Sequence, residues 1–208
     1  SLGGDWTNTG TFTSGGNTVT FNGVGTQTMT AIGVETFNNL TISKPSGTLT
    51  LNSDATVNNV FSLTAGTGAV GSGTLTLNGS VTGGGTLTSA STGTVDYAQS
   101  SAGQNVLALN YGNLIFSDFN KTLASIGTIG IAGTFTPGAA VGHTVTGSTI
   151  DFNGSSQTIP AFSYNNLTLS GSGTKTGTGT ITVSGNLNNN SGIVFTGTTT
   201  LNLNGTTH

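Results

Sequence analysis

Apolar residues alternate with threonine, serine or asparagine along most of the chain. Residues 48–51 read Thr-Leu-Thr-Leu, and residues 74–77 repeat the same four letters. A period of two places the apolar side chains on one face of a β-strand and the polar ones on the other. Glycine, asparagine and serine separate these runs, as expected of turns. No stretch has apolar residues at helical spacing over a dozen positions, so the pattern predicts an all-β protein with almost no helix.

One seven-residue pattern, here called the NL segment, occurs three times. It reads FNNLTIS at residues 37–43, YGNLIFS at 111–117 and YNNLTLS at 164–170. The aromatic residue and the leucine are three positions apart, whereas the leucine and the next apolar residue alternate as in a strand. A strand preceded by a corner fits this spacing, and the chain is therefore an internal repeat.

A second pattern, the TV segment, precedes each NL segment. It reads TVTF at residues 18–21, TVDY at 94–97 and TIDF at 149–152. The distance in sequence from its aromatic residue to that of the NL segment becomes shorter from unit to unit. It is 37 − 21 = 16 in the first unit, 111 − 97 = 14 in the second and 164 − 152 = 12 in the third. Only the connecting length varies, which is typical of a solenoid with insertions at its corners.

The spacing of the NL leucines indicates the length of one coil. The sequence separation is 114 − 40 = 74 from Leu40 to Leu114 and 167 − 114 = 53 from Leu114 to Leu167. The difference, 74 − 53 = 21, suits one coil of a β-solenoid with two or three short strands. We expect the first unit to contain an additional coil near residues 71–92. We also expect the three NL segments to stack in parallel register, with their leucines pointing inward and their aromatic residues, Phe37, Tyr111 and Tyr164, nearly superimposed.

The main alternative fold is a β-sandwich. Sandwiches seldom repeat one sequence in tandem, whereas each coil of a solenoid rests on a near-copy of itself. In a solenoid the recurring Asn-Gly pairs would mark one corner type, with asparagine side chains capping turns or forming ladders, whereas in a hairpin protein they would form type I′ turns. These pairs lie at residues 22/23, 78/79, 153/154 and 204/205.

The sequence therefore predicts a parallel β-solenoid, a right-handed β-helix of tandem degenerate repeats, with the β-sandwich as the alternative. We expect one solenoid domain over residues 1–208, with internal units at roughly 18–93, 94–148 and 149–208.

The amino-acid composition limits the classes of partner that the protein is expected to bind. Charged residues make up 4% of the chain, against about 25% in ordinary domains, so the surface consists of hydroxyl and amide groups. Lys44, Lys121 and Lys175 are the only basic residues apart from two histidines. This predicts no nucleic-acid partner, and the lack of a run of about 20 apolar residues predicts no membrane insertion. The lack of cysteine fits a secreted protein stabilised by repeated hydrogen bonds.

The repeats resemble the β-strand-repeat regions of secreted bacterial surface proteins, which are similar to the parallel β-helices of adhesins and autotransporter passengers. The middle unit departs from the pattern, with Ala98-Gln99 in place of Asn-Gly. The resemblance implies a structural or adhesive role at the cell surface, with no shared active site. The residues that carry it are 4–12, 18–23, 25–28, 37–43 and 73–79.

The sequence contains few residues that could take part in catalysis or bind a metal ion. Asp96 and Asp151 occupy equivalent positions in two TV segments and could lie on one face of the solenoid, but catalysis needs clustered carboxylates with stabilising groups. His143 and His208 belong to different units and lack the neighbours of a metal site. We therefore expect no catalytic, cofactor-binding or metal-binding residues, no cofactor and no enzymatic activity.

Two binding hypotheses remain. Trp6, Phe12 and Phe21 could form a strip for stacking sugars, although the recurrence of aromatic residues favours stacked core side chains. The Thr-x-Thr pairs raise ice binding, but the unequal spacings would be expected to scatter rows of threonine.

The predicted function is that of an extracellular structural protein, a subunit or segment of a surface fibre, stalk or adhesin. The first residues show no initiator methionine or signal peptide, so we expect a mature product, a proteolytic piece or an expressed fragment. Both ends read as strands without caps, which predicts head-to-tail association or continuation into further repeats. A carbohydrate-binding surface module is the alternative, with glycan as its partner.

Overall fold

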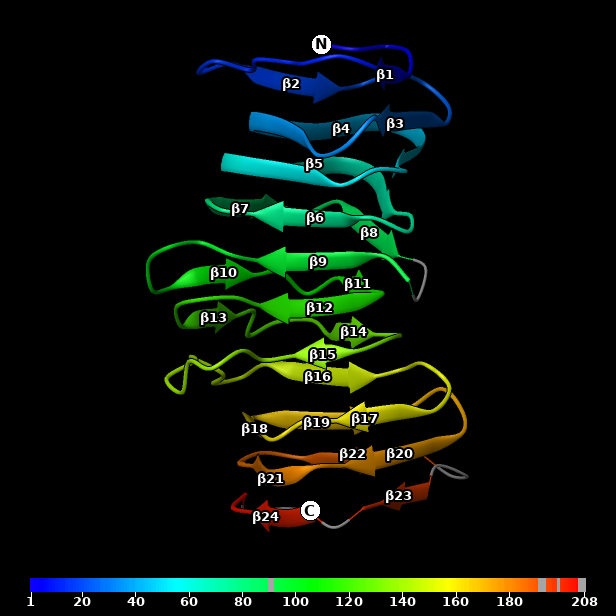
Figure 1. The fold of residues 1–208 in the computed structure, drawn as a ribbon. Coiled ribbons are helices and arrows are strands. Elements are labelled where there is room, and N and C mark those ends of the chain that lie inside the picture. Colours follow the sequence, from blue (N-terminus) through cyan, green and yellow to red (C-terminus); the bar gives the residue numbers. More distant parts are fainter. Residues whose placement is uncertain (90–91, 191–193, 198, 206–208) are drawn as a thin grey trace.

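The chain winds into a stack of about nine parallel coils, with the N-terminus at one end and the C-terminus at the other (Figure 1). The computed structural model describes residues 1–89, 92–190, 194–197 and 199–205. Within these residues there is no helix, and every pair of neighbouring strands is parallel. The prediction of an all-β parallel solenoid is confirmed, because a sandwich would pair its hairpin strands antiparallel.

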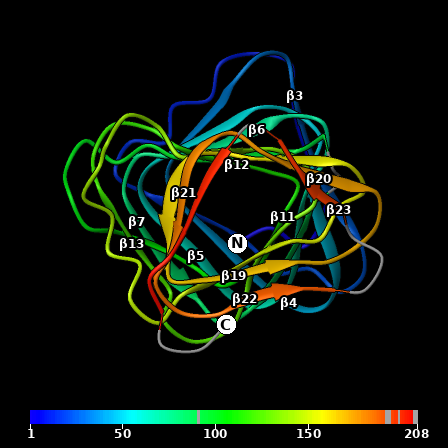
Figure 2. The same cartoon turned by 90° about the horizontal axis from the view of Figure 1, so that it is seen from below.

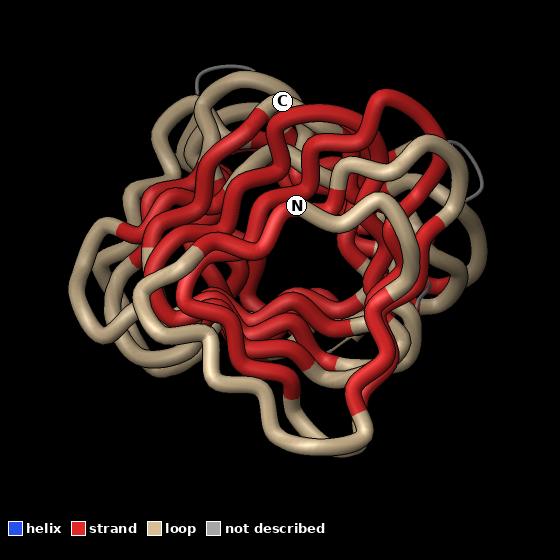
Figure 3. Tube along the Cα trace, turned by 90° about the horizontal axis from the view of Figure 1, so that it is seen from above, coloured by secondary structure: helices blue, strands red, loops and turns tan. Residues whose placement is uncertain are grey.

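Strands β4 (Glu35–Leu51) and β5 (Ala55–Val70) show the shape of one coil. Their ladder has three stretches in register, with register shifts after Phe37 and on both sides of Ser43. Each stretch lies on a different side of the stack, so the coils are three-sided when viewed along the axis (Figures 2 and 3). We call the sides that contain residues 39–42, 48–51 and 35–37 of β4 face 1, face 2 and face 3.

The remaining strands form one column on each face, and the chain visits the faces in the order 1, 2, 3. Face 1 holds β2 (Thr18–Phe21), β7 (Ser80–Gly83), β10 (Gln104–Val106), β13 (Lys121–Leu123), β18 (Phe162–Tyr164), β21 (Gly179–Val183) and β24 (Thr199–Leu203). Face 2 holds β1 (Trp6–Asn8), β3 (Gln27–Ala31), β8 (Thr86–Ser89), β11 (Asn110–Tyr111), β14 (Ile129–Ile131), β16 (Thr149–Phe152), β19 (Asn166–Leu169) and β22 (Leu187–Asn189). Face 3 holds β6 (Thr74–Leu77), β9 (Thr94–Tyr97), β12 (Asn113–Phe116), β15 (Phe135–Thr136), β17 (Gln157–Ile159), β20 (Thr174–Gly177) and β23 (Val194–Thr196).

The core is a column of apolar side chains that fills the inside of the coils. In β6, for example, Leu75 and Leu77 are buried while the threonines before them are only partly covered. The same alternation of half-buried and buried residues recurs in β9, β12, β16 and β19. Each fully buried leucine, isoleucine or phenylalanine contributes about 1.5–3 kcal/mol relative to an exposed one. The direct alternation of threonine and apolar residues in the sequence therefore determines which side chains lie inside the stack and which lie outside.

Each TV segment pairs directly with its own NL segment in the next coil. The register is the same in all three units, and all six apolar residues at the centre of these pairs except the half-buried Val19 are buried. The central pairs are Val19 with Leu40, Val95 with Leu114, and Ile150 with Leu167. The prediction that the NL leucines point inward from parallel strands is confirmed.

The prediction that the three NL segments lie above one another is wrong. Leu40 lies on face 1, Leu114 on face 3 and Leu167 on face 2, and Phe37, Tyr111 and Tyr164 pair with residues other than each other. The reason lies in the sequence separations of the leucines. The two separations differ by the length of one coil, and each equals a whole number of coils plus two thirds of a coil. The NL segment of each unit therefore lies two faces further along the winding order than that of the unit before, which gives the sequence of faces 1, 3 and 2.

The Asn-Gly corners permit very close stacking. A β-carbon on Gly79 would collide with the backbone carbonyl of Asn59 in the preceding coil, and one on Gly154 would collide with that of Ala132. Glycine is needed here because no side chain fits, not because of an unusual backbone angle. The expected asparagine ladders exist in part: Asn78 Nδ2 donates to Asn58 Oδ1 at 3.1 Å in the preceding coil.

Candidate functional site

Three buried glutamines, Gln27, Gln104 and Gln157, mark the corner that follows each TV segment. In each case Oε1 accepts a hydrogen bond from a backbone N–H of the same coil. The donors are Gly23 at 3.0 Å, Gln99 at 3.2 Å and Gly154 at 2.8 Å. The corner backbone is thus held by a side chain from inside the coil.

The amide nitrogen of each glutamine ties the corner to the preceding coil. In the last unit, Gln157 Nε2 donates to the carbonyl oxygens of Ile131 at 2.9 Å and Gly133 at 2.8 Å. Gln104 Nε2 makes the same pair of bonds to Leu77 at 2.8 Å and Gly79 at 2.7 Å. Gln27 bonds in the same way to the carbonyls of Leu2 and Gly4. The two acceptors are always two residues apart, so this is one repeated motif.

A buried lysine follows each glutamine after about one coil. The sequence separation is 44 − 27 = 17 in the first unit, 121 − 104 = 17 in the second and 175 − 157 = 18 in the third. The three lysines are at most 1% exposed. Lys44 Nζ donates to Gln27 Oε1 at 2.7 Å and to the Gly23 carbonyl at 2.9 Å. All three lysines of the chain are therefore internal, and we call each glutamine with its lysine a Gln–Lys corner.

The last Gln–Lys corner satisfies its cation completely. Lys175 Nζ donates to Gln157 Oε1 at 2.6 Å and to the carbonyls of Gly154 and Ser155 at 2.8 Å each. An ammonium group has three N–H donors, and all three find acceptors here. Burial lowers the pKa of Lys175, and Asp151 opposes this shift. Burial also lowers the pKa of Lys44, with Asp5 opposing.

The middle corner is incomplete. Lys121 is fully buried, but its Nζ has no hydrogen-bond partner among the described residues. In this unit Gln99 takes the place of the glycine, and the chain continues as a loop before Gln104. The pKa of Lys121 is lowered by burial, and the negative charges of Asp118 and Asp96 oppose this shift. A buried cation without hydrogen bonds costs stability.

His143 lies in the coil that follows Lys121. The backbone N–H of Lys121 donates to His143 Nδ1 at 3.0 Å, so the neutral ring carries its proton on Nε2. The ring is 5.4 Å from both Phe116 and Phe162, centroid to centroid. Burial lowers the pKa of His143, the carbonyls of Pro137 and Ala140 oppose the shift, and Lys121 adds to it. His143 is a half-buried residue that packs against these two rings. His208, its suggested metal partner, lies outside the described residues.

Asp96 and Asp151 do not share a face, contrary to one expectation. Asp96 is on face 3 and Asp151 on face 2, because their units are turned relative to one another. Each accepts a hydrogen bond from the serine of its NL segment in the next coil: Ser117 Oγ donates to Asp96 at 3.0 Å, and Ser170 Oγ to Asp151 at 2.8 Å. The pKa of both carboxyl groups is raised by burial, and the hydrogen bonds from the serines oppose this shift. These bonds fasten neighbouring coils.

The aromatic strip considered for sugar stacking is turned toward the core. Phe21 is fully buried, and Trp6 and Phe12 are half-buried with their rings 4.8 Å apart, edge to face. Trp6 Nε1 donates to the buried carboxylate of Glu35 at 2.7 Å. The interpretation of these aromatic residues as stacked core side chains matches these contacts.

The unequal spacings do not scatter the threonine rows within the first unit. The length differences are taken up at the corners, and rows stay in register, as with Thr36, Thr56 and Thr76 on face 3. Asp96 and Ile115 then continue the same row, so the threonine surface is interrupted there by a carboxylate and an apolar side chain.

The Gln–Lys corners were not predicted from the sequence, although the sequence contains a signal for them. The sequence predicted that Lys121 and Lys175 lie within a hydrogen-bonded stack, but it did not predict their pairing with glutamine, although each lysine follows its glutamine at the nearly constant spacing given above. In the described part of the chain, no group of three or more His, Cys, Asp or Glu residues is placed to hold a metal ion. The same residues include no helix suited to crossing a membrane. Comparisons with protein-family models, curated proteins and solved structures gave no match to this chain.

Proposed function

We propose that the chain is a non-enzymatic structural segment of an extracellular or cell-surface fibre, stalk or adhesin that assembles end to end. The observation that supports this best is the open ladder at each end of the stack. Among the described residues, β1 pairs only with β3, and β24 pairs only with β21. Each end thus presents a row of unpaired backbone N–H and C=O groups, which is a template for another strand.

The last coil also leaves apolar surface uncovered. Leu201 and Leu203 pair with Ile181 and Val183 of the preceding coil, which are fully buried. Leu203, in contrast, is 40% exposed. One more coil would cover these side chains, whether it came from the same polypeptide or from a second copy. Contact between opposite ends does not close on itself, so repeated contacts give a filament.

The charge distribution favours this assembly. The net charge is only −3 over 208 residues, so little repulsion opposes contact between copies. The resemblance to secreted bacterial surface repeats and the lack of cysteine support an extracellular place for such a fibre.

Light scattering and electron microscopy on the pure chain test this proposal. We expect the scattering to rise with concentration and filaments to form. Leu203→Glu places a carboxylate on the exposed end of the core and should suppress both. Ile126→Glu is the matched control, because Ile126 is 88% exposed on a loop at the side of the stack. A chain that stays monomeric at high concentration and forms no filaments contradicts the proposal.

A further inference from the structure

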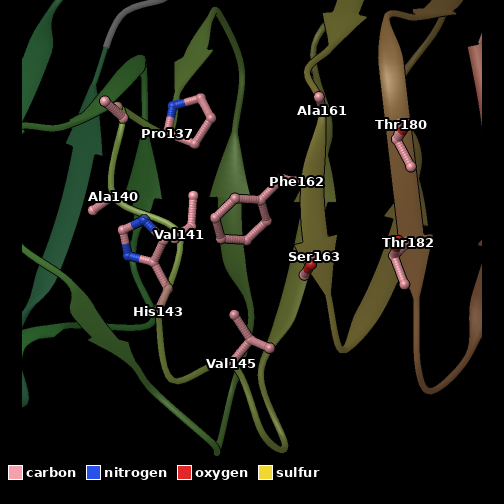
Figure 4. Close-up of a pocket in the computed structure, with 12 residues that line it drawn as sticks. Pro137, Ala140, Val141, His143, Val145, Ala161, Phe162, Ser163, Thr180 and Thr182 are labelled. Atoms are coloured by element: carbon pink, nitrogen blue, oxygen red, sulfur yellow. The ribbon is translucent and has the colours of Figure 1, made fainter.

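A groove of about 330 Å³ opens on the side of the stack, over face 1. One wall is the segment 137–145, which leaves the coil after β15, and the floor is formed by β18 and β21 (Figure 4). Its size is at the lower end of the range for small-molecule sites. Described coils lie on both sides of these strands along the axis, so the groove does not depend on what adjoins the first or last coil.

The floor presents free hydroxyl groups. Thr180 and Thr182 flank the buried Ile181, and Ser163 pairs with Thr182 and precedes the buried Tyr164, so the three side chains face outward from two adjacent coils. None of these hydroxyls has a hydrogen-bond partner among the described residues, unlike many hydroxyls elsewhere on the stack. Each is therefore available as both donor and acceptor.

The walls are apolar and uncharged. Pro137, Val141 and the partly exposed ring of Phe162 border the groove, and Val141 is fully exposed to solvent. His143 is the only titratable residue among those lining it, and it is held neutral by burial and by the bond from Lys121. An ionic ligand would find no counter-charge here.

We propose that this groove binds a neutral saccharide, with the C–H face of a sugar ring against the apolar wall and its hydroxyls on the row of Ser163, Thr180 and Thr182. A purely apolar ligand fits less well, because it would desolvate three hydroxyls without pairing them. Among the described residues β18 pairs only with β21, so its other edge is free. A peptide strand added at that edge would bond to the backbone in the plane of the sheet and would leave the three outward hydroxyls unused, so it explains the floor of the groove less well. The proposal is independent of the structural role above.

Nuclear magnetic resonance titration of the ¹⁵N-labelled chain tests the proposal, with cellohexaose, mannohexaose and chitohexaose as probes. We expect at least one probe to shift the amide signals of residues 161–163 and 180–182 and to leave the Trp6 indole signal unchanged. The double variant Ser163→Ala/Thr182→Val removes two hydroxyls with little change of shape. It should bind the same probe about tenfold more weakly, since two hydrogen bonds are lost.

Thr56→Val is the matched control, because Thr56 is an outward threonine on face 3 and should leave the affinity unchanged. The assignment is overturned if none of the three probes shifts these signals at millimolar concentration. It is equally overturned if the shifts map to the Trp6 segment, or if the double variant binds as tightly as the unaltered chain.

Discussion

The Nζ atom of Lys175 donates a hydrogen bond of 2.6 Å to Oε1 of Gln157, its strand partner in the preceding coil. The glutamine oxygen also accepts from the Gly154 backbone, and its amide nitrogen reaches the coil before, so one side chain joins a cation, a corner and a neighbouring coil. In the middle unit the corresponding Lys121 has no such bond. The two lysines are equally buried, and this difference separates a satisfied buried cation from an unsatisfied one.

Replacing each of these lysines by methionine should therefore give opposite results. Lys175→Met removes the ammonium donor from Gln157 Oε1 and from the carbonyls of Gly154 and Ser155, and should lower the free energy of unfolding by about 2–4 kcal/mol. Lys121→Met removes a buried charge without breaking a hydrogen bond, and should leave the free energy unchanged or raise it by about 1–2 kcal/mol. Guanidinium unfolding followed by circular dichroism measures both. Equal losses in the two variants would show that Lys121 has a partner after all.

The folded chain should resist trypsin. The enzyme cleaves after lysine or arginine; Lys44, Lys121 and Lys175 are buried, and Pro45 follows the first. Val141→Lys supplies the control, since residue 141 is fully exposed and lies on a loop. Gel electrophoresis over time should show the variant cut once near residue 141 while the unaltered chain stays intact. Digestion of both chains at the same rate contradicts the buried positions of the lysines.

Acid should weaken the fold through His143. Its pKa is lowered in the folded chain, so folding favours the neutral ring. The contribution of His143 to the free energy of unfolding is therefore fully present above the ordinary histidine pKa of about 6.5. The contribution is lost as the pH falls from that value toward the lower folded pKa, because the unfolded chain then binds the extra proton. The free energy of unfolding should therefore decrease with falling pH, by at most about 1.4 kcal/mol per pH unit from this residue.

His143→Phe isolates this effect. The ring packs against both Phe116 and Phe162, so phenylalanine suits the site, although the Lys121 N–H loses its acceptor at every pH. The variant should be less stable at neutral pH and less sensitive to pH below the ordinary histidine pKa. Urea titrations across this range measure the slope, and equal slopes for both chains would exclude His143 as its source.

Alanine substitution at two glycines should distinguish close stacking from simple flexibility. Gly79→Ala puts a methyl group against the Asn59 backbone and should cost about 2–4 kcal/mol. Gly84→Ala meets nothing within 4 Å and needs no left-handed backbone angle, so it should be neutral or stabilising by up to about 1 kcal/mol. Thermal unfolding of the two variants checks this. Similar melting temperatures would contradict the close approach at Gly79.

Period-two alternation was sufficient to predict the strands and the inward leucines, because it is a local property that each coil repeats. The parallel coils were predicted from the tandem repeats, since alternation alone also suits a sandwich. The relative rotation of the units was not predicted, because it depends on the fraction of a coil that separates successive NL leucines, and corner lengths conceal that fraction. The Gln–Lys corners were missed for another reason. Lysine is normally an exposed residue, and only the three-dimensional stack shows that Lys44 points at the corner containing Gly23.

The placement of the three units on three faces also bears on how such a chain changes by duplication. A copied unit fits at any of the three corners, since the TV and NL strands pair identically on each face. The inserted length therefore need not equal a whole number of coils, and the solenoid grows without a change of strand register. As a result, equivalent outer residues of successive units point to different sides of the stack, as Asp96 and Asp151 do. Copying the unit lengthens the rod, but the same outer residues are distributed around its axis instead of gathering along one line.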